Sequence, residues 1–234
     1  MGAQHVAVEG VRLAVRRGGP SAAPVGRRVL LLHGAGHTSA IWAPLIEELA
    51  SDRMVLAVDR RGYGDSEAAP ADAVQEARDY AALLVREVDE AANGRGHQDD
   101  DPDSSDADDV RPDPTDVVAE GDGVDVALAL SALRPDLVGR LVLVEGPRRG
   151  GTLARWTGRQ SSPRVDAPAP DRALLIASAP KGAVPAQALM KSLVLLAADP
   201  STIRMVTLPA TVGVPLEAAP ALVTTIVAGF VRET

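Results

Sequence analysis

The stretch VVAEGDGVDVALAL, residues Val117–Leu130, decides the fold. Its opening valines are typical of a buried strand, and the glycines at 121 and 123 mark a tight turn. The apolar run that follows predicts a helix over residues 124–133. The stretch therefore predicts a strand, a Gly-rich turn and the start of a helix. No Ser, Cys or Thr stands in the turn itself, which reads Ala-Glu-Gly-Asp-Gly from residue 119 to 123.

Strands and helices are predicted in alternation along the rest of the chain. Short runs rich in Val and Leu, each closed by Gly or by a charged turn, predict buried strands. These runs are Arg27–Gly34, Met54–Gly62, Gly139–Gly146, Arg172–Ser178 and Ile203–Pro209. Helical patterns occur at Ser39–Ala50, Val74–Ala91, Pro185–Ala198 and Ala218–Val231. The alternation predicts an α/β fold with a mostly parallel, doubly wound sheet. The opening residues, His5–Gly19, predict an antiparallel hairpin at the sheet edge.

The composition is that of a single globular domain, residues 1–234. Hydrophobic residues make up 46% and charged residues 24% of the chain, which is long enough to bury a substantial core. The absence of cysteine excludes disulfides, thiolate metal sites and a Cys nucleophile. The N-terminus does not resemble a signal peptide, and no apolar run approaches the ~18 residues of a membrane span. We therefore expect a cytoplasmic protein that does not contact membranes.

Two segments fall outside the alternation of strands and helices. Nine Asp and one Arg lie between His97 and Asp116, so this segment accounts for the whole net charge of −8. So many like charges predict an acidic mobile loop over residues 97–116. The remainder is neutral, which gives no support to nucleic-acid binding. Residues 147–170 are rich in Gly and Pro and contain five Arg, and we expect them to form a short lid.

Three stretches resemble α/β-hydrolase-fold proteins over essentially the whole chain. LLLHGAGHTSAIW, residues Leu30–Trp42, is similar to the family's His-Gly oxyanion loop. AVDRRGYGDS, residues Ala57–Ser66, resembles its next strand and turn. LSALRPDLVGRLVLVEG, residues Leu130–Gly146, resembles the helix after the nucleophile elbow and the strand that follows it. The resemblance implies a sheet of the α/β-hydrolase type with a short lid.

In this family the elbow carries the nucleophile, and small residues are required two positions before and two positions after it. With Gly121 in the nucleophile position, the flanking residues are Ala119 and Gly123, which fit. With Asp122 in that position, as in an epoxide hydrolase or dehalogenase, the flanking residues would be a Glu and a Val, which do not fit. We therefore assign Gly121 to the nucleophile position.

The other two members of the family's catalytic triad are also missing. The resemblance places the acid after the seventh strand, where Lys181 stands, and the histidine after the eighth strand, close to Gly213. No histidine occurs after His97. With nucleophile, acid and base all absent, we do not expect the triad mechanism to operate.

Other side chains remain as catalytic candidates, because loops at the carboxyl ends of the strands converge on one pocket. Asp122 and Glu145 could act as desolvated acids or bases; helix capping and a salt bridge are their alternative roles. His37 could be a general acid or base, or an exposed loop residue. His33 could take part in catalysis or brace the loop. Glu120 is expected to point away from the pocket.

Binding groups are predicted around the same pocket. The backbone N–H groups of Ala35, Gly36 and Asp122 could stabilise an anion or an enolate without a serine. Further binding candidates are Gly121, Trp42, Arg148, Trp156 and Lys181. Arginine forks in the lid suit carboxylate or phosphate, so we expect a small, anionic substrate. A short lid would leave the pocket open or completed by a second copy in a homodimer. No zinc or dinucleotide motif occurs, so we expect no metal and no cofactor.

Three functions follow from these observations. The first is a non-hydrolytic enzyme on a hydrolase scaffold, a cyclase, isomerase or lyase that uses acid/base and positioning catalysis. The Arg-rich, Lys-poor composition suggests a GC-rich bacterial genome and, by analogy, natural-product biosynthesis. The second is an inactive protein that binds a ligand or partner. The third is a hydrolase or acyltransferase with a displaced nucleophile, either Asp122 or a lid serine, Ser161 or Ser162.

Overall fold

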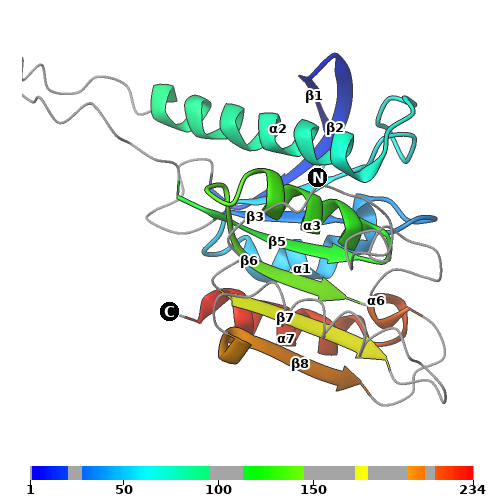
Figure 1. Cartoon of the computed structure of the whole chain (residues 1–234), viewed down its shortest axis with the longest axis vertical. Helices are drawn as coiled ribbons and strands as arrows, with labels where there is room; N and C mark the ends of the chain where they lie inside the picture. The colour runs from blue at the N-terminus through cyan, green and yellow to red at the C-terminus, as the bar shows by residue number, and fades with distance from the viewer. Residues whose placement is uncertain are drawn as a thin grey trace, which may run out of the picture.

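A computed structural model describes residues 2–20, 28–94, 113–144, 172–178, 200–208 and 214–233. Within these ranges the chain forms one eight-stranded sheet, in the order β1-β2-β4-β3-β5-β6-β7-β8 (Figure 1). The strands are β1 Gln4–Val8, β2 Val11–Gly18, β3 Val29–Leu32, β4 Val55–Val58, β5 Thr115–Glu120, β6 Val138–Val144, β7 Arg172–Ser178 and β8 Ile203–Leu208. β1, β2 and β4 pair antiparallel, and all other neighbouring strands pair parallel. The predicted α/β fold with a mostly parallel sheet is confirmed, and so is the hairpin at its edge.

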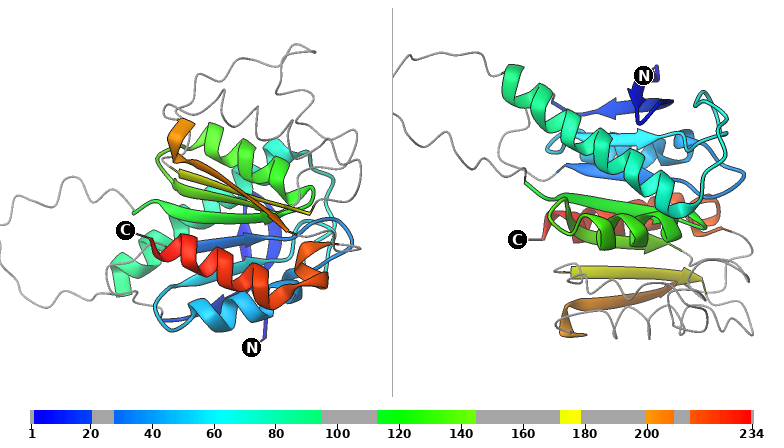
Figure 2. Two further views of the ribbon diagram at one scale, coloured as in Figure 1. Left: turned by 90° about the horizontal axis from the view of Figure 1, so that it is seen from below. Right: turned by 45° about the horizontal axis from the view of Figure 1, so that its top comes forward.

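Helices cover both faces of this sheet. The helices described are η1 Ser39–Trp42, α1 Ala43–Leu49, α2 Ala73–Gly94, α3 Gly123–Leu133, η2 Pro200–Thr202, α6 Pro215–Ala218 and α7 Pro220–Arg232. Residues of α2 and α3 pack with one apolar cluster, and residues of α1 and α7 pack with a second. Figure 2 shows these two pairs of helices on opposite sides of the strands. Valine, leucine and isoleucine supply most of both clusters, as the scarcity of aromatic residues requires.

Several predicted boundaries change in the structure. The helix predicted over Ser39–Ala50 is a 3₁₀ turn followed by α1, whose first turn contains a proline. The helix predicted over Ala218–Val231 begins earlier and is divided at Ala219 into α6 and α7. Pro220 explains this division, because proline lacks the N–H that would continue the α6 ladder.

The predicted acidic loop, residues 97–116, includes two residues at its carboxyl end that belong to a strand. Thr115 and Asp116 belong to β5, and both side chains are buried. A carboxylate can be buried there because Asp116 Oδ1 accepts a hydrogen bond of 2.9 Å from the backbone N–H of Arg140 in β6. Most of the predicted loop, the predicted lid at 147–170 and the predicted helix Pro185–Ala198 lie outside the described residues.

Parallel register brings the functional segments to one edge of the sheet. Leu32 pairs with both Val58 and Ala119, and Glu120 pairs with Val144, so β3, β4, β5 and β6 end side by side. The loops after these strands therefore meet, as they do in other open α/β sheets. In the described part of the chain, no helix combines the length and apolar character needed to cross a membrane.

Candidate functional site

The turn between β5 and α3 is a tight elbow built on two glycines. Gly121 has a φ of +58°, in the left-handed region that glycine adopts without strain. A Cβ atom at this position would lie 3.2 Å from Gly34 Cα. At Gly123 a Cβ would lie 2.8 Å from the carbonyl oxygen of His33, so only glycine lets α3 begin this close to β3. These contacts support Gly121 as the apex of the elbow.

Asp122 ties the elbow to the loop after β3. Its Oδ1 accepts a hydrogen bond of 2.5 Å from the Ala35 N–H and lies 3.0 Å from Arg60 Nη1. The side chain does not cap α3, although it stands at the helix N-terminus. The Ala35 donor that we expected to stabilise a substrate oxygen is therefore occupied by the protein's own carboxylate. Gly36, the other loop residue expected to donate, is exposed.

Glu120 makes a second connection to the same loop. Its Oε2 accepts hydrogen bonds from the Gly34 N–H at 2.7 Å and from His37 Nδ1 at 3.1 Å. Glu120 is buried and faces the loop after β3, a contact that the sequence analysis did not predict. Gly34 is the physical reason, because a Cβ there would lie 2.6 Å from the same carboxylate oxygen. The missing side chain leaves the space in which Glu120 approaches the loop.

His37 lies between two carboxylates, Glu120 and Glu217, that are far from it and from each other in the sequence. Its Nδ1 contacts Glu120, and its Nε2 lies 3.0 Å from Oε1 of Glu217 in α6. The two carboxylate partners differ in exposure: the Glu120 side chain is 4% exposed and the Glu217 side chain is 58% exposed. Burial alone would lower the pKa of His37, but the hydrogen bonds and charges of Glu120 and then Glu217 outweigh it and raise the pKa.

His33 has a different environment, although it lies in the same loop. It is fully buried, its Nδ1–H donates to the Gly34 carbonyl at 2.8 Å, and its Nε2 accepts from the Arg60 N–H at 2.9 Å. Burial is the main reason that the pKa of His33 is lowered. With both ring nitrogens bonded to backbone, His33 has the contacts of a neutral residue that braces the loop.

Arg60 joins the elbow to α2. It is buried, and its Nε and Nη2 each donate to Glu76 at 2.9 Å in a bidentate pair, while Nη1 faces Asp122. Burial opposes its charge, but the pairing with Glu76 prevails and raises the pKa of Arg60 further. The Tyr80 hydroxyl also contacts Glu76. The elbow, the loop after β4 and α2 are thus linked by one ion-pair network, which is buried at Arg60 and Glu76 and partly exposed at Asp122.

The other predicted site residues lie apart from this cluster or outside the described residues. Trp42 is fully buried in the apolar cluster that includes α1 and α7, where it packs in the core. Glu145, Arg148, Trp156, Lys181 and Gly213 lie outside the described residues. Of the predicted catalytic residues, the structure brings together His37, His33 and Asp122.

Glu217 was missed by the sequence analysis. It stands 180 positions from His37, in a short helix with no motif of its own, so no local signal marks it. The pairing depends on the register of the sheet, which carries α6 to the edge where the loop after β3 ends. Within the described ranges, no three His, Cys, Asp or Glu side chains are arranged to hold a metal ion.

Comparison with known proteins agrees with this architecture. A family model described as the alpha/beta hydrolase family matches residues 29–231. Among solved structures, the Cif epoxide hydrolase from Acinetobacter nosocomialis has a TM-score of 0.69 at 14% identity, over 97% of this chain and 88% of that one. The esterase RhEst1 from Rhodococcus sp. ECU1013 has a TM-score of 0.68 at 19% identity, over 100% of this chain and 99% of that one.

A third similar structure is Cfl2 from Burkholderia cenocepacia, with a TM-score of 0.65 at 17% identity, over 98% of this chain and 95% of that one. No curated protein matches the sequence. Identities this low show a common fold only. The family model covers most of the chain, and the sheet order and the elbow agree with it: the chain belongs to the alpha/beta hydrolase family.

Proposed function

We propose that this protein is a non-hydrolytic enzyme, an isomerase or lyase that transfers a proton at a carbon atom beside a carbonyl or carboxyl group. The observation that carries the proposal is the position of His37, with Nδ1 on a buried carboxylate and Nε2 on an exposed one. The pair formed by His37 and Glu217 would supply the acid and the base. Glu120 would orient the ring.

The direction of the His37 pKa assigns these roles. Because the pKa is raised, the imidazolium is more populated near neutral pH than that of an unperturbed histidine, and its Nε2–H can serve as the proton donor. Glu217, 3.0 Å from Nε2, is the nearest acceptor and the natural base. In the proposed step Glu217 takes the proton from the carbon, and the electron pair of that C–H bond forms an enolate. His37 Nε2–H donates to the enolate oxygen, where the charge develops.

The elbow argues against acyl transfer. Gly121 offers no nucleophilic atom, and a side chain there would press against Gly34. The Ala35 N–H, which would stabilise a tetrahedral oxyanion, is bonded to Asp122. The Arg-rich, Lys-poor composition supports, as part of the same proposal, a role in bacterial natural-product biosynthesis, and the lack of a signal-like N-terminal run supports a cytoplasmic location.

Isotope exchange tests this proposal without knowledge of the natural substrate. A panel of small ketones, keto acids and hydroxy acids would be incubated with the protein in D₂O, and NMR would follow deuterium entering the carbon beside the carbonyl. We expect exchange above the buffer rate for at least one class, and a loss of about 10²–10⁴-fold in His37→Gln. Exchange that is equally fast in His37→Gln, or absent throughout, would contradict the proposal.

A second candidate is a catalytically inactive binding protein. The observation that favours it is that Glu120 and Asp122 already occupy the Gly34 and Ala35 N–H groups. A binding protein would show saturable binding of a panel member, for example as a rise in melting temperature, with no isotope exchange. The enzyme proposal requires both saturable binding and isotope exchange.

A further inference from the structure

We infer that His37 Nε2 is the docking point for a carboxylate group of the ligand, which takes the place of Glu217. This inference rests on the proposed function for the reaction that follows, but it concerns binding and names the ligand class. It starts from the unequal contacts of the two ring nitrogens.

The Nδ1 side of His37 is permanent. Glu120 is 3% exposed and is held by the Gly34 N–H as well as by the ring, so removing it would leave a buried donor without a partner. The Nε2 side is replaceable. Glu217 lies on a short helix, its side chain is 58% exposed, and water can solvate its carboxylate when it leaves the ring.

Charge decides which ligand can replace Glu217. The imidazolium and Glu120 form a neutral pair, and the nearby Asp122 faces Arg60. Glu217 adds one negative charge at Nε2. A ligand carboxylate therefore exchanges one anion for another, and it keeps a charge-assisted hydrogen bond that a neutral oxygen cannot match. Glu217, displaced from the ring, is solvated by water on its exposed side, which screens its charge from the ligand carboxylate, and it remains the base of the proposed reaction.

Acetate is the probe for this site, with acetamide as its neutral analogue. Glu217→Ala opens the site, and fold integrity would be checked by circular dichroism, since an exposed side chain tolerates replacement. Long-range ¹H–¹⁵N NMR would follow the ring nitrogens of His37 while acetate, acetamide or chloride is added at constant ionic strength. Should Glu217→Ala fail to fold, Glu217→Ser offers the same opening.

The expected result is a saturable shift of the His37 Nε2 signal with acetate in Glu217→Ala, about tenfold tighter than with acetamide. Acetate should also raise the His37 pKa of the variant back toward that of the wild type, and it should bind the wild type more weakly because Glu217 competes. Equal responses to acetate and acetamide, or none to acetate, would overturn the inference. Acetate binding in Glu217→Ala, together with no isotope exchange by the wild type, would leave the inference standing and remove the proposed reaction instead.

Discussion

At the scale of single residues, one loop holds two histidines in opposite environments. His33 is enclosed by backbone partners and is stabilised as the neutral ring, whereas His37 lies between two carboxylates and is stabilised as the imidazolium. Sequence analysis identified both positions, because the loop resembled a known segment. It could not assign their charge states, because Glu120 and Glu217 reach His37 only through the fold.

The first prediction concerns the pKa of His37. Glu120→Gln should lower this pKa more than Glu217→Gln, because Glu120 is buried and makes the stronger contact. ¹H–¹⁵N NMR titration of the His37 ring measures its pKa in both variants. A larger effect from the exposed partner would contradict the assignment of Glu120 as the permanent contact.

The same pKa shift predicts a dependence of stability on pH. The folded-state pKa of His37 lies above its unfolded value, about 6.5. Its stabilising contribution is therefore fully present below about pH 6.5 and is lost as the pH rises through the folded-state pKa. In urea unfolding, the difference between wild type and His37→Gln should shrink as pH increases across this window. His33 has the opposite sign, since its lowered pKa favours the folded state above about pH 6.5.

Gly34 offers a third test, because its missing side chain admits Glu120. In Gly34→Ala the new Cβ would displace the Glu120 carboxylate, lowering the His37 pKa and costing about 1–2 kcal/mol of unfolding free energy. Gly229→Ala is the matched control. It adds the same methyl group in open space on α7 and should stabilise by about 0.5–1 kcal/mol through helix propensity. Chemical denaturation measures the unfolding free energy of both variants, and NMR titration measures their His37 pKa. An unchanged His37 pKa in Gly34→Ala would count against the role of Glu120.

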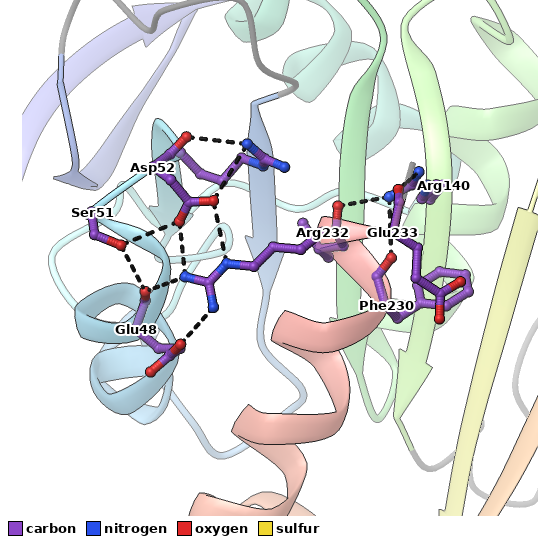
Figure 3. Close-up of polar contacts among 9 residues, drawn as sticks. Glu48, Ser51, Asp52, Arg140, Phe230, Arg232 and Glu233 are labelled. Carbon is purple, nitrogen blue, oxygen red and sulfur yellow. Dashed lines mark hydrogen bonds and ion pairs between the residues drawn. The ribbon is translucent and has the colours of Figure 1, made fainter.

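At the scale of elements, two arginines fix the end of α7 in different ways (Figure 3). Arg140 of β6 is buried and donates to the carbonyl oxygens of Phe230, Val231 and Glu233, which end the helix. Arg232 lies nearer the surface and pairs with Glu48 and Asp52, at the end of α1 and in the turn after it. α7 is thus held by its last turn, and α6, the short helix before it, carries Glu217.

These contacts predict unequal effects of substitution. Arg140→Met should lower the unfolding free energy by about 2–3 kcal/mol, because buried carbonyls at the negative end of a helix lose a charged donor. Arg232→Met should cost about 1 kcal/mol or less, since its partners are screened by water, and its effect should shrink further in high salt. Urea unfolding at low and high salt measures both. Equal losses of unfolding free energy in the two variants would show that burial does not determine how much these contacts stabilise the protein.

The elements themselves were largely predictable. Every strand predicted within the described residues is present, because buried parallel strands read as continuous runs of Val and Leu. Helix ends were less predictable: the division at Ala219 depends on Pro220, and the burial of Asp116 depends on the backbone of a neighbouring strand. Local patterns specify the type of an element, and tertiary contacts specify its ends.

At the scale of the whole molecule, the sheet order explains why the site could be located but not described from the sequence. Parallel strands end at one edge, so the loop after β3, the elbow after β5 and the start of α6 must meet there. The side-chain contacts within the site depend on local spaces, such as the one that the missing side chain of Gly34 leaves for Glu120. A fold shared with esterases and epoxide hydrolases thereby holds a histidine between two carboxylates, beside an elbow with glycine at its apex.

The central claim, that this protein does not act through a covalent serine intermediate, is tested most directly by a fluorophosphonate serine probe read by intact mass, together with turnover of an activated acyl ester. The account predicts no mass adduct and no ester turnover above buffer, with a serine esterase labelled in parallel as the positive control. A stoichiometric adduct on a serine of this chain, with matching ester turnover, would contradict it and return the protein to covalent hydrolysis.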